Sequence, residues 1–535
     1  MFLGFPPVKT NAELDPESQL GSAHIPQFRQ QMGHISRHSF VFFLGTIFTA
    51  AAGYVFKVYL ARMLGAEALG VYALGMTIIG LLGIFNAFGL PQAAVLFVAA
   101  YSATGKVESL RKFLGRGISL LLISNLLFCA VLLLVGPWIA VRVYHTAALS
   151  KYIGLFALIM LLGTLTTFLG QVLAGYKDVT RRTVITNFIG TPLTMALSVA
   201  LIVMGFGLRG YILAQVLSAV GVLLLLTVSV LKLTPPGQSF VVAISSPLEK
   251  EVISFSALAF GITLLGFFMA TSDQILIGVY LNARDLGIYA IAMALVAFVP
   301  IILQSVNQIF SPTIAELHAR GEHTMLARIF QTLTKWTLGL TLPLAAVMII
   351  FAPVLMRIFG HDFEIGWPIL VIGTVGQLVN CGVGSVGYLL QMSGYQRNLV
   401  KIQTVMAIVM VVLGFLLIPR WGIVGAAAAA AITTLASNLW YLWEVRRRLG
   451  MSPYNISYLR LLLPLAGTVG ALLLEHKLLL GLCSAWVLVG LAMAVAYVAF
   501  ICIAVGFGLD SDDRIILNAI WSRIGGKFVL RGVSA

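Results

Sequence analysis

The sequence LGAEALGVYALGM at residues 64–76 returns, with small changes, as LNARDLGIYAIAM at residues 281–293. The two stretches match at an offset of 217 residues without a gap. Seven residues of the first copy recur in the second: Leu64, Ala66, Leu69, Gly70, Tyr72, Ala73 and Met76 as Leu281, Ala283, Leu286, Gly287, Tyr289, Ala290 and Met293. Weaker matches follow in the same order, such as Gly175-Tyr176 with Gly394-Tyr395. The pattern predicts an internal duplication.

The composition of the chain indicates a membrane protein. Of its 535 residues, 60% are hydrophobic and only 10% are charged, whereas soluble domains carry about 25% charged residues. A helix crosses the hydrocarbon core with about 20 apolar residues, and stretches of this kind repeat between residues 39 and 506. We therefore predict an all-α integral membrane protein with several membrane-spanning helices.

Fourteen membrane-spanning helices are predicted from the apolar stretches. Their approximate ranges are 39–61, 69–94, 117–141, 152–175, 183–206, 210–231, 252–279, 286–311, 330–354, 366–391, 399–418, 421–443, 459–474 and 479–506. The apolar run at 69–100 is longer than one crossing needs. It contains Gly89-Leu90-Pro91, and we expect the second helix to bend at this point.

The basic residues predict the orientation of the chain in the membrane. With the N-terminus inside, the cytoplasmic segments hold 25 Lys and Arg residues and the outside loops hold 8. Positive charge marks the cytoplasmic side of bacterial-type inner membranes, so both termini are expected in the cytoplasm. The net charge of +15 is spread over many short loops, which is typical of membrane topology and not of nucleic-acid binding.

The repeat and the orientation together predict the domain organisation. Both copies of the repeated sequence fall in loops that face outside, so the two halves have the same orientation and form a parallel repeat. The expected parts are a disordered cytoplasmic tail (1–36), a six-helix N-lobe (37–232), a cytoplasmic linker (233–250), a six-helix C-lobe (251–448), two extra helices (449–507) and a cytoplasmic tail (508–535). Such lobes rock against each other around a path between them.

No catalytic or metal-binding motif stands out in the sequence. The four cysteines (Cys129, Cys381, Cys483 and Cys502) lie in apolar stretches without ligand-like spacing, and we interpret them as small core residues. The sequence contains no P-loop, Ser-His-Asp, HExxH or CxxC arrangement. The GxGxxG match at 382–387 lies within an apolar span and is interpreted as close helix packing. We expect neither enzymatic activity nor a bound cofactor or metal.

Residues 61–90 and 273–293 resemble the corresponding helices of Wzx-type polysaccharide flippases. These proteins belong to the multidrug/oligosaccharidyl-lipid/polysaccharide (MOP) transporter superfamily, and the resemblance covers about residues 39–448 together with the extra helix pair. It implies movement of a lipid-linked oligosaccharide, typically on undecaprenyl pyrophosphate, from the inner to the outer leaflet of the cytoplasmic membrane. It also implies alternating access coupled to a proton or sodium gradient. The polysaccharide assembly machinery is a candidate partner. The long N-terminal tail departs from the pattern of these flippases.

Two charged residues inside predicted spans require an explanation, because a charge in the membrane interior costs roughly 2.5–3.5 kcal/mol. Lys57 lies in the first helix and Asp273 in the seventh, and the repeat aligns Lys57 with Gln274. One hypothesis pairs Lys57 with Asp273 across the lobes, leaving Lys57 to attract pyrophosphate and Asp273 to take a proton or cation when the lobes part. In the alternative, Lys57 reaches the outer headgroups and Asp273 bonds locally to Ser272 or Gln274.

Three neutral polar residues, Gln304, Asn307 and Gln308, lie at helical spacing in the eighth predicted helix. They are candidate contacts for sugar hydroxyls, which need neutral donors and acceptors. The alternative is that they hold neighbouring helices together.

Two other functions remain open at this point. A multidrug exporter of the same superfamily is the first, although several acidic residues would be expected in its cavity. A membrane glycan polymerase or ligase is the second, although large outer loops would be expected of it.

Overall fold

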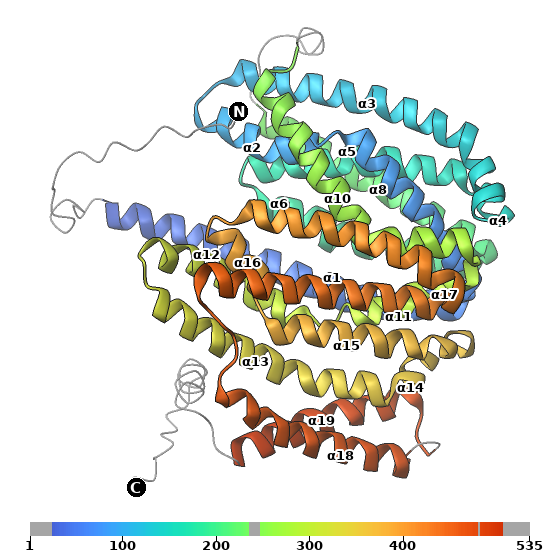
Figure 1. Ribbon diagram of the computed structural model, residues 1–535. Coiled ribbons are helices and arrows are strands. Elements are labelled where there is room, and N and C mark those ends of the chain that lie inside the picture. Colours follow the sequence, from blue (N-terminus) through green and yellow to red (C-terminus); the bar gives the residue numbers. More distant parts are fainter. Residues whose placement is uncertain (1–23, 235–246, 480–481, 507–535) are drawn as a thin grey trace, which may run out of the picture.

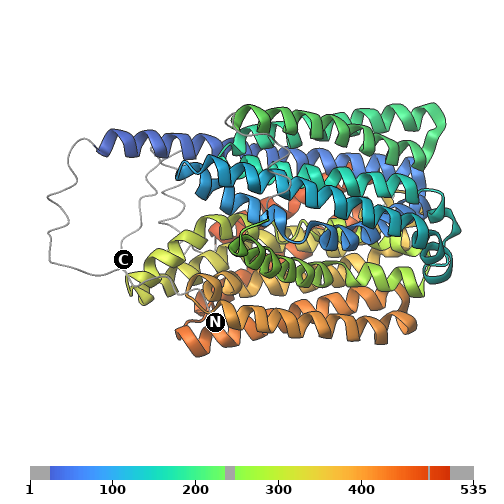
Figure 2. The ribbon, with the colours of Figure 1, turned by 90° about the horizontal axis from the view of Figure 1, so that it is seen from above.

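The computed structural model describes residues 24–234, 247–479 and 482–506 of the chain. All regular elements within these ranges are helices, and most of them run side by side along one direction (Figures 1 and 2). The fold class is therefore all-α, as predicted. The two tails at 1–23 and 507–535 and most of the predicted linker, at 235–246, lie outside the described residues.

The helices of the first half are α1 His24–Ala87, α2 Leu90–Ala103, α3 Val107–Trp138, η1 Ile139–Val143, α4 Ala147–Ser150, α5 Ile153–Gly175, α6 Val179–Thr183, η2 Val184–Gly190, α7 Thr191–Leu201, η3 Ile202–Phe206 and α8 Gly207–Leu233. Those of the second half are α10 Lys250–Tyr280, α11 Ala283–Val296, α12 Ile301–Ala319, α13 His323–Ile350, α14 Ala352–Arg357, η4 His361–Gly366, α15 Trp367–Val383, α16 Val386–Met392 and α17 Gln396–Leu449. The last elements are η5 Ile456–Leu461, α18 Leu462–Leu479 and α19 Ala485–Gly506.

The protein is a multi-pass membrane protein. Within the described ranges, 10 helices are long and apolar enough to cross a membrane, or 11 if a pair bent by 50° in α11 and α12 counts as one span. Three long helical stretches each cover two predicted spans, and each contains a glycine with non-helical backbone angles: Gly65, Gly205 and Gly422. The number fourteen stays a prediction.

The chain doubles back at one of these glycines. A Cβ atom at Gly425 would lie 2.3 Å from the carbonyl oxygen of Leu417. Residues eight apart in a straight helix are about 12 Å apart, so α17 consists of two antiparallel arms joined at Gly422, which has φ 59°. Residues other than glycine rarely adopt this φ angle, because their Cβ atom clashes with the backbone.

Several predicted helices are interrupted by proline or glycine. The predicted helix at 286–311 is wrong as a single element, because a turn at 297–300 that ends in Pro300 separates α11 from α12. Gly384, with φ 75°, divides the predicted helix at 366–391 into α15 and α16. The predicted bend at Gly89-Leu90-Pro91 is confirmed, since α1 ends at Ala87 and α2 begins at Leu90. Residues 24–36, expected in the disordered tail, are helical.

The loops between the helices gather at two opposite ends of the bundle. The turns at 104–106, 176–178 and 320–322 lie at the end drawn on the left of Figure 1, which we call the basic end. The turns at 144–146 and 281–282 lie at the other end, which we call the opposite end. This separation agrees with the alternation of basic loops along the sequence.

The two copies of the repeated sequence pack against each other at the opposite end. A Cβ atom at Gly70 would lie 1.5 Å from the carbonyl oxygen of Ala283, and one at Gly287 would lie 1.9 Å from that of Ala66. The repeat offset maps Gly70 onto Gly287 and Ala66 onto Ala283, so the contact is reciprocal. This is the geometry that a two-fold relationship between the halves requires.

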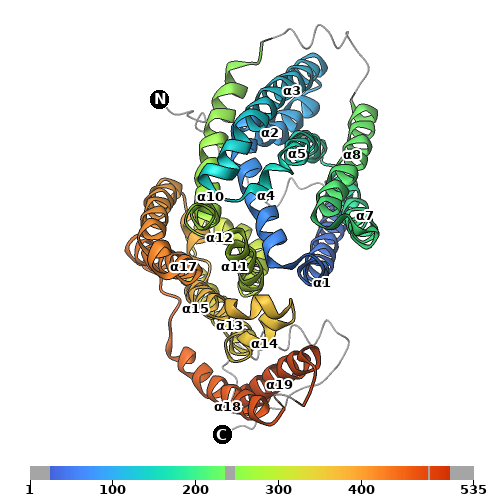
Figure 3. The ribbon, with the colours of Figure 1, turned by 90° about the vertical axis from the view of Figure 1, so that its right-hand side faces the viewer.

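Helix α10 connects the two lobes along its length. Near the basic end it packs on α2, where a Cβ atom at Gly89 would lie 2.2 Å from the carbonyl oxygen of Ser256. Toward the opposite end it packs on α17, where Tyr280 and Phe415 meet edge to face at 6.0 Å. The extra helices α18 and α19 pack on α13, at one side of the bundle (Figure 3).

Candidate functional site

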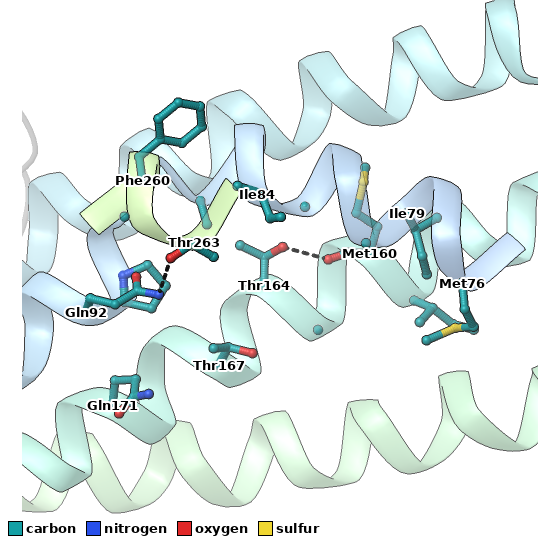
Figure 4. A pocket seen from close by; sticks show the side chains of 17 residues that line it. Met76, Ile79, Ile84, Gln92, Met160, Thr164, Thr167, Gln171, Phe260 and Thr263 are labelled. Carbon is teal, nitrogen blue, oxygen red and sulfur yellow. Dashed lines mark hydrogen bonds between the residues drawn. The ribbon is translucent and has the colours of Figure 1, made fainter. Parts of the chain in front are cut away.

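A pocket lies where the N-lobe meets α10. It has a volume of about 340 Å³ and is lined by α1, α2 and α5 of the N-lobe and by α10 of the C-lobe (Figure 4). None of its 17 lining residues carries a charge. The polar lining residues are Gln92, Thr164, Thr167, Gln171 and Thr263, and Phe260 adds an aromatic ring.

Glycines open the space that the pocket fills. Gly80, Gly83, Gly89 and Gly163 all line it, and no heavy atom lies within 4 Å of the position that a Cβ would take at Gly83 or Gly163. Gly89, with φ 72°, ends the bend between α1 and α2 and contacts the backbone of α10 directly.

Hydrogen bonds join the two lobes at the pocket and toward the basic end. The Nε2 of Gln92 on α2 donates to the Oγ1 of Thr263 on α10 at 3.2 Å (Figure 4). The hydroxyl of Tyr101 donates to the carboxylate of Glu249 at 2.7 Å, just before α10 begins. Movement of α10 away from the N-lobe must break both bonds.

A buried polar cluster lies behind the pocket wall. Asn86 and Asn125 are fully buried, and the Nδ2 of Asn86 donates to Asn125 and, at 3.1 Å, to the Oγ1 of Thr164. Ser124 donates to the backbone oxygen of Asn86 at 2.8 Å. The cluster ties α1, α3 and α5 together, and it fixes the Thr164 side chain that reaches the pocket.

An arginine outside the pocket lining bonds one of the lining residues at the basic end of α5. The guanidinium of Arg182 donates to the Oε1 of Gln171 at 3.2 Å. Arg182 is partly buried. It projects from α6, which follows the turn after α5, and so it reaches back along the helix that lines the pocket.

Asp273 is buried and hydrogen-bonded. Only 6% of the residue is exposed. Its carboxylate accepts a hydrogen bond from the hydroxyl of Tyr289 at 2.5 Å and another from the backbone N–H of Gln274 at 2.8 Å. The Gln274 side chain accepts from the hydroxyl of Thr77 at 3.4 Å, across the lobes. The Oγ of Ser272 has no partner.

Lys57 is exposed, in contrast to Asp273. Among the ion pairs of the described residues, none joins Lys57 to Asp273. In this arrangement of the lobes, Asp273 bonds locally to Gln274, as the alternative hypothesis predicts, and it also bonds to Tyr289.

The three polar residues of the eighth predicted helix do not share one environment. Gln304 and Gln308 are exposed on α12, whereas Asn307 is 7% exposed and its Oδ1 has no hydrogen-bond partner. None of the three lines the pocket. A bend of 50° separates the helix that carries them from α11.

Two kinds of site residue escaped the sequence analysis. The pocket residues Gln92 and Gln171 are single amides within apolar stretches, and this isolation was the available signal. Tyr289, the partner of Asp273, lies in the repeated sequence, where its recurrence indicates duplication but gives no sign of the bond to Asp273.

Among the cysteines, Cys381 is buried but Cys502 is exposed, so the interpretation as core residues is wrong for Cys502. In the described ranges, no group of three metal-ligating side chains occurs.

The fold and the pocket define a class of protein, namely multi-pass membrane proteins with two helical lobes related by an internal repeat. The family model described as "Polysaccharide biosynthesis protein" matches residues 35–318, and the chain belongs to this family. The MatE model matches residues 259–420. Membership of the MOP superfamily, implied by the resemblance, is thereby confirmed.

One curated relative is the "Probable low-salt glycan biosynthesis flippase Agl15" of Haloferax volcanii. It is 26% identical over 170 residues, which make up 31% of this chain and 36% of the relative. The match thus spans about a third of that protein.

Solved structures show the same fold at low sequence identity. The lipid II flippase MurJ, in an inward closed conformation, has a TM-score of 0.69 and 14% identity, with 88% of this chain and 98% of that chain covered. An inward-facing MATE family multidrug resistance transporter has a TM-score of 0.59 and 14% identity, with 75% and 94% covered. At these identities the likeness concerns the fold alone.

Proposed function

We propose that this protein is a flippase for a lipid-linked oligosaccharide. It moves the glycan, carried on undecaprenyl pyrophosphate, from the inner to the outer leaflet of the cytoplasmic membrane by alternating access of its two lobes. The chain acts in this proposal as a transporter and not as an enzyme. Its family and its relative named a glycan biosynthesis flippase support this function.

The uncharged lining of the pocket is the observation that carries the proposal. Five hydroxyl and amide side chains, including Thr167 and Gln171, supply the neutral donors and acceptors that sugar hydroxyls need. Apolar lining residues such as Ile84 and Met160 supply a surface for the face of a sugar ring. A volume of about 340 Å³ is at the small end of ligand sites, and it suits one part of an oligosaccharide.

The same lining argues against the two alternative functions. An exporter of organic cations needs carboxylates in its binding cavity, and none of the lining residues is acidic. A glycan polymerase or ligase needs catalytic side chains near its substrate, and the lining offers no nucleophile with an adjacent base. The flippase is therefore the function that the pocket favours.

The remaining parts of the proposal concern the setting of transport. We place both termini and the basic end in the cytoplasm, because positive loops stay on the cytoplasmic side. We propose that a proton or sodium gradient drives the cycle and that Asp273 is the group that responds to it. The polysaccharide assembly machinery would receive the flipped glycan.

Leaflet accessibility in proteoliposomes tests the proposal. The wild-type protein, reconstituted with a fluorescent undecaprenyl-pyrophosphate oligosaccharide and an imposed ion gradient, should move the glycan to the opposite leaflet. No movement with several native-like glycans, together with uptake of organic cations, would favour the exporter instead.

Two neighbouring threonines provide a matched pair for the pocket. Thr167 lines the pocket, whereas the hydroxyl of Thr166 donates to the carbonyl oxygen of Leu162 at 2.7 Å and does not line it. Thr167→Val should weaken glycan binding about fivefold, since one hydrogen bond contributes about 1 kcal/mol. Thr166→Val should leave binding unchanged. Equal affinity in both variants would place the glycan elsewhere.

A further inference from the structure

The charges at the basic end of α5 are unevenly matched. Asp178 lies in the turn before α6, and its carboxylate pairs with Arg181 at 3.1 Å. Arg182, the next residue, has no carboxylate partner in the part of the chain that the structure describes. Its hydrogen-bond partner is the neutral amide of Gln171. One positive charge is thus left without compensation.

Arg182 is held in place although it is uncompensated. Its side chain lies over Gly170, where an added Cβ would be 3.5 Å from the Nε atom. The bond to Gln171 fixes the guanidinium beside a residue that lines the pocket. A partly buried cation loses hydration, and this loss is offset only by a partner that accepts its hydrogen bonds.

We propose that Arg182 binds the phosphate group next to the sugar of the lipid-linked substrate. This inference rests on the proposed flippase function. A planar guanidinium binds phosphate oxygens through paired N–H donors. The sugar would occupy the pocket, and its phosphate would lie at the pocket's basic end, where Arg182 follows Gln171. The site therefore selects a glycan that carries an anion at its linkage.

The position of Arg182 also gives the substrate a direction. Gln171 lies at the basic end of α5, whereas Met160 lies about 16 Å farther along the helix, since each residue adds about 1.5 Å. Both residues line the pocket. A glycan whose phosphate is held near Gln171 extends its sugars toward Met160, away from the basic end. In this orientation the phosphate enters the site after the sugars. It stays at the basic end, beside the inner leaflet from which the lipid comes.

Binding measurements with three probes test the inference on the full-length protein in nanodiscs. The probes are an isoprenyl pyrophosphate-linked disaccharide, the same disaccharide on an uncharged isoprenyl ether, and phosphatidylglycerol. Arg182→Gln should weaken binding of the first probe at least about tenfold, because it removes a hydrogen bond to a charged group. Binding of the uncharged probe should not change.

Two control variants accompany Arg182→Gln. Arg181→Gln removes a neighbouring charge that is already paired with Asp178, and it should bind all three probes as the wild type does. Arg182→Lys keeps the charge but loses the planar donors, so it should recover part of the affinity. If Arg182→Gln does not fold, the ratio of the two glycan affinities in Arg182→Lys still tests the inference.

Three results would overturn the inference. The first is equal loss of both glycan probes in Arg182→Gln, which indicates a purely structural role. The second is unchanged pyrophosphate binding in this variant. The third is loss of phosphatidylglycerol binding alone, which assigns Arg182 to an ordinary lipid headgroup. In each case, glycan movement by the wild type in proteoliposomes shows separately whether the flippase function itself holds.

Discussion

The carboxylate of Asp273 accepts a 2.5 Å hydrogen bond from the hydroxyl of Tyr289 in the interior of the protein. The equivalent tyrosine of the first repeat, Tyr72, instead bonds the neutral side chain of Gln215 at 3.1 Å. The position equivalent to Asp273 is Phe56, which packs on Tyr59. The duplicated halves therefore differ at this point, and only the second half carries an acid bonded to the repeated tyrosine.

We predict that Asp273→Asn separates binding from coupling. The variant should still bind the glycan, because Asp273 does not line the pocket. Its transport rate should no longer depend on an imposed proton or sodium gradient, since the amide has no charge to neutralise. Transport measured with and without each gradient checks this, and an unchanged gradient dependence would contradict it.

A companion variant, Tyr289→Phe, should lower stability by about 1–3 kcal/mol, because it leaves a buried carboxylate with one donor fewer. Tyr72→Phe removes a bond between neutral groups and should cost about 1 kcal/mol. The two melting temperatures in one detergent give the comparison. A larger loss in Tyr72→Phe than in Tyr289→Phe would contradict the prediction that the bond to Asp273 is the more stabilising of the two.

The exchange of Lys57 and Asp273 tests whether the two residues ever pair. Asp273 is buried with Tyr289, and Lys57 is exposed. We therefore expect the double variant Lys57→Asp/Asp273→Lys to transport no better than either single variant. Recovery of transport in the double variant would show that the pair forms in another arrangement of the lobes.

Substitution of Gly70 should weaken the contact between the lobes. In Gly70→Ala the added Cβ would lie 1.5 Å from a backbone oxygen, and such overpacking costs about 1–3 kcal/mol. Gly266→Ala is the control, because nothing lies within 4 Å of its added Cβ, and alanine favours a helix by up to about 1 kcal/mol. The melting temperature should fall in the first variant and not in the second.

Glu475 in α18 should be dispensable for stability. It is 8% exposed, and neither carboxylate oxygen has a hydrogen-bond partner. Glu475→Leu should stabilise the protein by about 1–3 kcal/mol, the cost of burying an unpartnered polar group. The equally buried Glu444 accepts from Asn398 at 3.1 Å and from Arg448 at 3.3 Å, so Glu444→Leu should instead destabilise. Thermal unfolding of both variants decides this prediction.

Most of the fold was predictable because helices in a membrane follow from apolar length. The limits of α10, predicted at 252–279 and observed at Lys250–Tyr280, show this. Breaks within a span were predicted only where glycine and proline stand together, as at Gly89 and Pro91. Single interrupting residues such as Gly384 were missed, because their backbone angles depend on neighbouring helices.

The site was less predictable than the fold. Asp273 stood out because a charge in an apolar stretch is costly, and the structure shows it buried and bonded. The pocket could not be seen in the sequence, since it depends on how α10 of one lobe packs on α2 of the other. Gln304 and Gln308 share a helical face, but the environment of that face depends on the turn before α12, which the sequence did not predict.

The reciprocal contact of Gly70 and Gly287 has a consequence for the origin of the chain. In a symmetric homodimer, a residue on the two-fold axis meets its own copy and the surface complements itself. The contact between α1 and α11 has this form within one polypeptide. A half-length ancestor that paired through a single glycine would have assembled the same two lobes from identical subunits. After fusion, each copy became free to diverge, and an acid such as Asp273 could arise on one side alone.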